Sequence, residues 1–301
     1  MFAAETVVTP PGRPACLLRS PVARLVVFFT LLKLFQWVAG EAWTALGLPA
    51  GFIPFRDTTL TMELLRLGPI VLAYALLVGL VERRRADELA VAKAAPHLLL
   101  GLAGGALCFS LIVAALWALG AFVVEGVNRD VDWVGRLLVM GVGAGVGEEI
   151  ISRGVLFRII EEGLGTWAAL LISAAVFGGL HAWNPNASAW SVVAIALEAG
   201  LLFGLLYHVT RSLWVCMGAH AAWNVAQGPL YGIPVSGFEQ RGLLASHMQG
   251  PDWLTGGAFG AEASVAALCI CSLATSVCLA VAIRRGSLVP PPWRRPGTQP
   301  G

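Results

Sequence analysis

The sequence predicts an all-α protein, a polytopic membrane helix bundle of about eight transmembrane helices. The chain of 301 residues is 57% hydrophobic and only 13% charged, whereas an ordinary soluble domain is about 25% charged. Its mean hydropathy is +0.76. A soluble fold has too little interior to bury this much apolar surface, so lipid must be the solvent over most of the chain.

Eight apolar runs approach the roughly 20 residues, or 17–25 with tilt, that cross a bilayer as a helix. The second is short, and the first contains Lys33, Gln36 and Glu41. The first run is also longer than the apolar region of a cleaved signal peptide, which is about 7–15 residues, so it predicts a retained span. The expected spans are residues 23–46, 67–81, 96–123, 134–160, 167–183, 190–207, 213–231 and 261–283.

The spans predict one membrane domain over residues 23–285, between an N-terminal tail (1–22) and a Pro-rich C-terminal tail (286–301). Positive charges favour both tails on the cytoplasmic side, because arginines concentrate in the loops that such a topology places inside. Arg83, Arg84 and Arg85 are one such group. A composition rich in Ala, Gly and Arg and poor in Lys is typical of bacteria, which indicates the cytoplasmic (inner) membrane.

The charge and cysteine content exclude other classes. The net charge is +2, and no basic patch lies outside the flanks of apolar runs, so no nucleic-acid partner is expected. None of the six cysteines forms a Cys-x-x-Cys pair. We interpret them as small buried hydrophobic residues.

Ionisable residues inside the spans require a reason, because placing a charge in the bilayer is costly. Apart from Lys33 and Glu41 in the first span, the ones that matter here gather in four consecutive spans, the fourth to the seventh. The residues are Glu148, Glu149, Arg153, His181, Glu198 and His220, with the polar Asn224 one turn after His220.

Helix geometry gives the two adjacent glutamates different roles. At about 100° per residue, Glu149 and Arg153 lie about 40° apart on the helix, and Glu four residues before Arg is the favourable order for an ion pair. Glu148 lies about 140° from Arg153 and is left to face a cavity. A carboxylate in a low-dielectric site suits a general base near neutral pH.

These side chains together predict a hydrolytic site. Glu148 would take a proton from water, with His181 helping to hold that water. His220 and Asn224, one turn apart, would donate hydrogen bonds to a developing oxyanion.

The same residues resemble a known family. Glu148, Glu149 and Arg153 form Glu-Glu-x-x-x-Arg, Phe177 and His181 form Phe-x-x-x-His, and His220 and Asn224 form His-x-x-x-Asn. In this order on successive spans, the three motifs are similar to those of the CAAX-protease and bacteriocin-processing (CPBP) membrane proteins, also called the Abi or type II CAAX prenyl endopeptidase family. The similarity covers residues 134–224, about a third of the chain.

The resemblance implies an eight-helix intramembrane endopeptidase, with a catalytic core at about residues 134–231 and the first glutamate as base. It implies a membrane peptide or protein as substrate, of which a lipidated CAAX-like peptide is one form. Members have been described both as metalloproteases and as metal-free glutamate proteases. Zn²⁺ could be held by Glu148, His181 and His220, which leave a fourth position for water, but the chain lacks the His-Glu-x-x-His helix. We expect a metal-free site and retain Zn²⁺ as the alternative.

Other readings stay open from sequence alone. The buried Glu, His and Arg would also suit a proton relay in a proton-coupled transporter, although no inverted repeat is visible. A non-catalytic membrane scaffold or immunity protein is the third possibility. Glu198 matches none of the three motifs, and we expect it to line a cavity or to be structural. The loop 232–260 is predicted to be either an ordered turn-rich cap or a gate.

Overall fold

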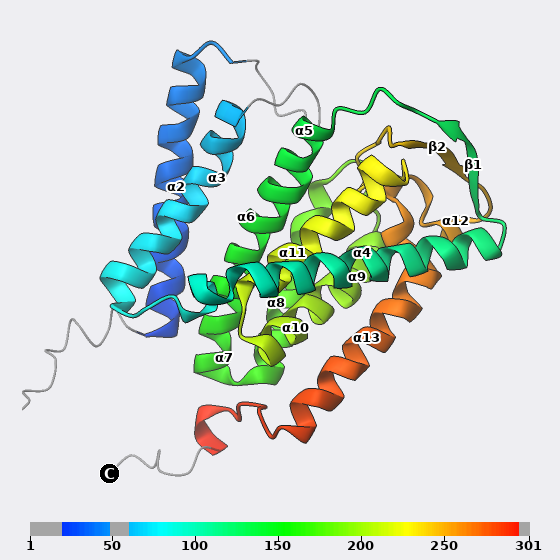
Figure 1. The fold of residues 1–301 in the computed structure, drawn as a ribbon. Helices are drawn as coiled ribbons and strands as arrows, with labels where there is room; N and C mark the ends of the chain where they lie inside the picture. The colour runs from blue at the N-terminus through cyan, green and yellow to red at the C-terminus, as the bar shows by residue number, and fades with distance from the viewer. Residues whose placement is uncertain (1–19, 49–59, 295–301) are drawn as a thin grey trace, which may run out of the picture.

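The computed structural model describes residues 20–48 and 60–294 and confirms the predicted fold class, because this part of the chain is almost entirely helical (Figure 1). Two short strands are the exception. The α-helices are α2 (Pro21–Ala45), α3 (Leu60–Leu76), α4 (Ala94–Ala118), α5 (Trp133–Arg136), α6 (Gly145–Glu149), α7 (Arg158–Leu164), α8 (Thr166–Leu180), α9 (Ala189–Ile195), α10 (Leu202–Thr210), α11 (Leu213–Val225), α12 (Asp252–Thr255) and α13 (Val265–Arg284); the strands are β1 (Phe122–Val127) and β2 (Leu244–Met248).

Six helices in the described residues are long and apolar enough to cross a membrane. They correspond to six of the eight predicted spans, and the protein is accordingly an integral membrane protein. They are Pro21–Ala45, Leu60–Glu82, Asp87–Ala118, Thr166–Trp183, Ala189–Thr210 and Val265–Arg284.

The other two predicted spans are also helical, and they contain most of the motif residues. The fourth runs without a break from α5 to α7, from Trp133 to Leu164, and includes several charged residues. The seventh is α11, which continues as a π-helical turn over Ala226–Leu230. A count of eight crossings remains a prediction.

Several helices are interrupted by π-helical turns, which the sequence analysis did not predict. In the helix from α5 to α7, π turns over Leu137–Ala144 and Ile150–Phe157 flank α6. Another, over Ala196–Leu201, joins α9 to α10. Such turns are rare and are frequently found at functional sites.

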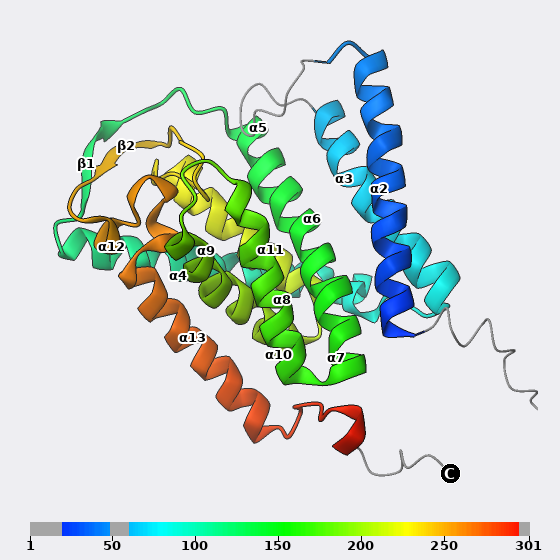
Figure 2. The same cartoon turned by 180° about the vertical axis from the view of Figure 1, so that it is seen from behind.

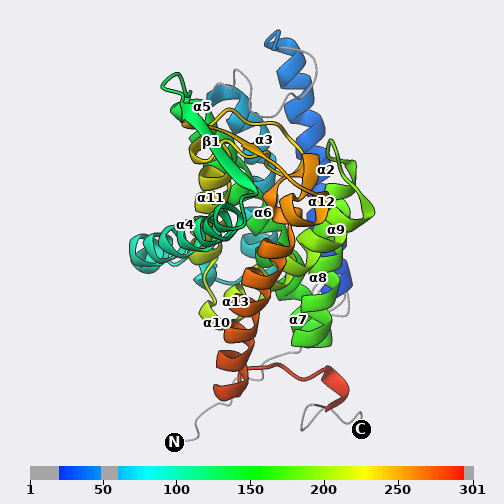
Figure 3. The ribbon, with the colours of Figure 1, turned by 90° about the vertical axis from the view of Figure 1, so that its right-hand side faces the viewer.

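The other helices are arranged around the continuous helix from α5 to α7 (residues 133–164), which we call the motif helix (Figure 1). Helices α2 and α3 lie side by side at one edge, and α8 to α10 pack on the opposite side of α6 and α7 (Figure 2). Helix α4 lies across α11 (Figure 3). Glycines allow this crossing, because a Cβ on Gly105 would lie 2.8 Å from the Ala219 carbonyl carbon and one on Gly218 2.5 Å from the Leu98 oxygen.

The loop between α11 and α13 is an ordered, turn-rich structure, which we call the cap (residues 232–264). Its strand β2 pairs antiparallel with β1, which follows α4. Its turns use glycines at positive φ, such as Gly256 (84°) and Gly260 (121°). The indole of Trp190 donates to the Ala263 carbonyl (2.8 Å), which attaches the cap to α9. Of the two alternatives for this loop, the structure has the ordered cap.

A network of ion pairs lies at the end of the bundle opposite the cap. The Glu82 carboxylate forms ion pairs with Arg24 (3.1 Å) and Arg158 (2.9 Å), and Arg84 forms one with Glu88 (2.6 Å). Glu82 and Glu88 are both largely buried. The network joins α2, the segment that follows α3, and α7, so it fixes the helices on one side of the motif helix at this end.

The C-terminal segment after α13 returns to the start of α8. The Thr166 amide donates to the Val289 carbonyl (2.9 Å), and the Val289 amide donates to the Thr166 hydroxyl (2.8 Å). Residues 286–294 of the predicted tail are thus in contact with the bundle, whereas 295–301 lie outside the described residues.

Candidate active site

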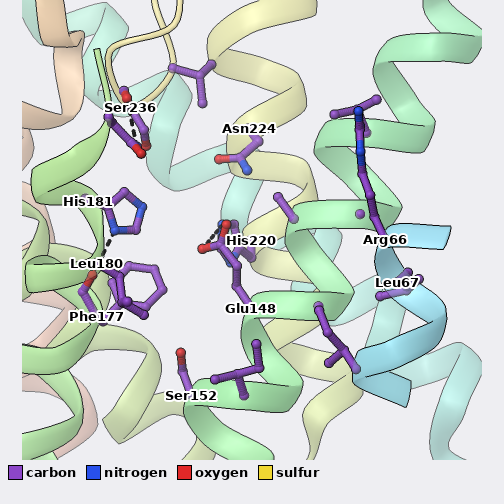
Figure 4. Close-up of a pocket in the computed structure, with 18 of the residues that line it drawn as sticks. Arg66, Leu67, Glu148, Ser152, Phe177, Leu180, His181, His220, Asn224 and Ser236 are labelled. Atoms are coloured by element: carbon purple, nitrogen blue, oxygen red, sulfur yellow. Dashed lines mark hydrogen bonds and ion pairs between the residues drawn. The ribbon is translucent and has the colours of Figure 1, made fainter. Parts of the chain in front are cut away.

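The three motifs converge on one cavity of about 380 Å³. Its walls include Glu148 from α6, His181 from the end of α8, and His220 and Asn224 from α11 (Figure 4). The four residues predicted as catalytic from separate spans therefore lie around one space. Their chemical roles are considered below as a proposal.

Glu148 is the motif glutamate that reaches the cavity. Its side chain is 40% exposed, whereas that of Glu149 is 0% exposed. The difference follows from the helix, since adjacent residues point about 100° apart. Glu148 is thus the carboxylate that can contact a molecule in the cavity.

Glu149 is the centre of a buried cluster. Its Oε1 accepts from Arg153 Nη1 (2.9 Å) and lies 2.9 Å from His220 Nδ1. Arg153, 1% exposed, also donates to the Ala199 carbonyl (2.7 Å) and lies over the ring of Phe177. The ion pair predicted from the i,i+4 spacing is confirmed, and it joins the motif helix to α11 and to the π turn at Ala196–Leu201.

His220 connects the two glutamates. Because a carboxylate only accepts hydrogen bonds, Nδ1 is the nitrogen that carries a proton toward Glu149. Nε2 then lies 4.0 Å from Glu148 Oε2. Nε2 can donate only when the ring is charged, and the neighbouring charges allow this, since Glu148 and Glu149 face one arginine, Arg153.

His181 lies in a 3-10 turn that directly follows α8. Its Nδ1 donates to the Phe177 carbonyl (2.8 Å), which leaves Nε2 for the cavity. The predicted spans placed His181 too deep relative to Glu148, and the structure shows why. The motif helix ends at Leu164 rather than residue 160. Glu148 therefore lies 16 residues before that end (164 − 148), and His181 lies 15 residues after the start of α8 at Thr166 (181 − 166), which brings the two to a similar depth.

Sequence reasoning missed two charged residues that line the same cavity from α3. They are Glu63, 5% exposed, and Arg66, whose Nη1 lies 3.8 Å from Glu63 Oε1. The predicted second span began at residue 67, so both fell outside it, whereas the helix begins at Leu60. A carboxylate three residues before an arginine at the start of an apolar run was the signal available.

The cap closes the cavity at a further side with Ser236 and Phe238. The Asn184 amide, which follows the His181 turn, donates to the Ser236 carbonyl (3.0 Å). This bond joins the cap to the segment that contains His181.

Glu148, His181 and His220 line the same cavity, but the structure does not bring them together as a three-ligand set. Each histidine has Nδ1 on an acceptor, which is the pattern of metal-binding histidines. A site needs three or more convergent donors, and within residues 20–48 and 60–294 no three His, Cys, Asp or Glu side chains converge in this way.

A Glu, two His and an Asn from three helices thus surround one cavity of a membrane helix bundle. Residues 130–226 match the family described as type II CAAX prenyl endopeptidase Rce1-like. The match confirms the family predicted from the three motifs, over the segment that contains all of them, and this family indicates a CAAX-type intramembrane protease. No curated protein matches the chain significantly.

Proposed function

We propose that this protein is an intramembrane endopeptidase that hydrolyses a peptide bond of a membrane-associated peptide or protein. The observation that carries the proposal is that the two adjacent glutamates lie in different surroundings. Glu149 is buried on Arg153 and His220, while Glu148 faces the cavity with His220 Nε2 4.0 Å away. One carboxylate is therefore structural and the other is free to react.

In the proposed reaction, Glu148 removes a proton from a water molecule, and the oxygen adds to the scissile carbonyl carbon. Charged His220 and the amide of Asn224 donate to the resulting oxyanion. Glu148 then returns its proton to the nitrogen as the C–N bond breaks, which gives an amine and a carboxylic acid. His181 helps to hold the water.

The residues need no metal ion for these steps, and metal-free hydrolysis is the mechanism that we propose. In this mechanism Glu149 fixes the orientation of His220 through Nδ1, which leaves Nε2 to donate to the oxyanion. The substrate class follows the matched family, and a lipidated CAAX-like peptide is one candidate. We also propose a bacterial inner membrane location with both termini inside.

The test is cleavage by Glu148→Gln, which keeps the shape of the side chain but removes the base. Loss of a general base lowers turnover by about 10²–10⁴-fold, and the folded fraction should not change because Glu148 is partly exposed. Wild type, Glu148→Gln and a control at the exposed Glu125, Glu125→Gln, would be incubated in detergent with a fluorogenic library of lipidated and unlipidated peptides.

Cleavage by wild type and by Glu125→Gln, but not by Glu148→Gln, supports a protease with Glu148 as base. Equal cleavage by all three contradicts this role of Glu148. If no sample cleaves any peptide, a flux assay in vesicles with the same variants is the next measurement, since a transporter would lose flux in Glu148→Gln.

A further inference from the structure

A second, smaller cavity lies behind the histidines. It has a volume of about 20 Å³, which is room for about one water molecule. Its lining shares His181, His220, Asn224 and Ser236 with the main cavity. We call it the rear cavity, and these shared residues form the wall between the two.

Two buried carboxyl groups line the rear cavity from different parts of the chain. Glu198, 1% exposed, lies on the π turn between α9 and α10, and neither of its oxygens has a hydrogen-bond partner among the described residues. Glu262, 3% exposed, comes from the cap and lies near Ser236 of the cap and Gln227 of the π turn after α11. Its Oε1 has no partner in the same part of the chain.

No cation among the described residues neutralises both groups. Arg153 is the arginine bound to this π turn, through the Ala199 and Gly200 carbonyls, but Glu149 already matches its charge. Two histidines are among the titratable neighbours: His220 lines the rear cavity but is bound to Glu149, and His181 lies near Glu262. The other two are Cys108 of α4 and Cys271 of α13, which lie near Glu198.

Two buried carboxyl groups without a cation do not both ionise, because desolvation and mutual repulsion oppose the second charge. Burial also raises the pKa of Glu262, which favours its protonated form. Since the two groups border a space that holds one water, a water can connect the protonated member to the ionised one.

We propose that Glu198 and Glu262 hold one proton between them through a water in the rear cavity, and that their remaining negative charge is a positioning charge for His181. This inference rests on the proposed function. Each histidine then has a carboxylate nearby. Glu149 contacts His220 directly, whereas His181 Nδ1 is bound to a backbone carbonyl, and its carboxylate is the Glu198–Glu262 pair. The negative charge of the Glu198–Glu262 pair stabilises a charged His181, which then donates a hydrogen bond from Nε2 into the main cavity.

The first test is infrared spectroscopy of the purified protein at neutral pH, with wild type and the double variant Glu198→Gln/Glu262→Gln. A protonated carboxyl group has a carbonyl band that shifts in deuterated water. We expect one such band in wild type to be missing from the double variant. The single variant Glu198→Gln should also lack it, because Glu262 without a charged neighbour ionises. Identical spectra of wild type and the double variant would overturn the shared proton.

The second test is the rate of peptide cleavage. The double variant should lower kcat about tenfold or more, since removal of a neighbouring opposite charge costs at least about one pK unit, while KM stays the same because the substrate occupies the main cavity. Each single variant keeps one carboxylate and should remain close to wild type. An unchanged kcat in the double variant would overturn the positioning role. A loss of folded protein would also lower the apparent kcat without changing KM, so kcat is calculated per folded molecule, with the folded fraction measured by thermal unfolding.

Glu125→Gln on the exposed β1 is the matched control and should change neither the infrared band nor kcat. The two arms also separate this inference from the proposed function. If wild type cleaves no peptide, the proposed protease fails, while the infrared arm still decides whether the carboxyl pair holds a proton.

Discussion

Replacing Arg153 with methionine should destabilise the protein strongly, because the buried carboxylate of Glu149 loses its arginine and keeps the contact with His220. The side chains of Arg153 and Glu149 are 1% and 0% exposed, and 2.9 Å separates their charged atoms. Breaking a buried pair by removing one partner costs about 3–5 kcal/mol. The variant also leaves the Ala199 carbonyl without its 2.7 Å donor, so the upper half of this range is expected.

The measurement is the free energy of unfolding in mixed detergent micelles, arranged as a double-mutant cycle. Glu149→Gln removes the other charge, and Arg153→Met/Glu149→Gln contains neither. The double variant should be less destabilised than the sum of the single variants, with a coupling of about 0.5–3 kcal/mol. Arg241→Met, at an exposed arginine of the cap, is the control and should stay within about 0.5 kcal/mol of wild type.

Two results would refute this reasoning. A loss of less than about 1 kcal/mol in Arg153→Met would mean that Glu149 is not held by this charge, given the 3–5 kcal/mol expected for a buried pair. If the losses in the free energy of unfolding of the two single variants simply add in the double variant, the contact contributes no coupling energy.

Three further outcomes are expected. Gly105→Ala should cost about 1–3 kcal/mol by overpacking, because its Cβ would meet the Ala219 carbonyl, whereas Gly104→Ala on the same helix meets nothing within 4 Å and should be neutral or stabilising in the same unfolding assay. A chelator should leave peptide cleavage unchanged, and metal analysis of the purified protein should find zinc well below one ion per chain; stoichiometric zinc lost together with activity would reverse the mechanism. Tyr231→Phe removes the 2.9 Å bond to the Ser110 hydroxyl and should lower the free energy of unfolding by about 0.5–1.5 kcal/mol without a change in cleavage rate.

The helical fold and the convergence of the polar residues could be predicted from the sequence because both depend on local patterns. Apolar runs of sufficient length leave few alternatives to membrane helices. The i,i+4 spacing of Glu149 and Arg153 predicted their ion pair, and the order of the three motifs predicted that Glu148, His181 and His220 would meet.

The features that were missed depend on contacts that are distant in the sequence or on small changes of helix geometry. Residues 122 and 123 were assigned to a span because they are apolar, yet they form β1 with Met248 and His247, whose distance along the chain gives no local signal. The π turn at Ile150–Phe157 has no sequence signature and changes the angle per residue just after Glu149. Glu198 and Glu262 were not paired for the same reason, since only the packing of the cap brings them to one cavity.

The hydrogen bonds between Thr166 and Val289 attach the C-terminal segment to the first residue of α8. A truncation placed before Val289 would remove the acceptor of the Thr166 amide, which lies in the first turn of α8, the helix that His181 directly follows. Shortened versions of this protein would then differ from the full chain at the start of α8 as well as at the terminus. Comparisons between such versions would report on α8 even where the intention is only to remove a tail.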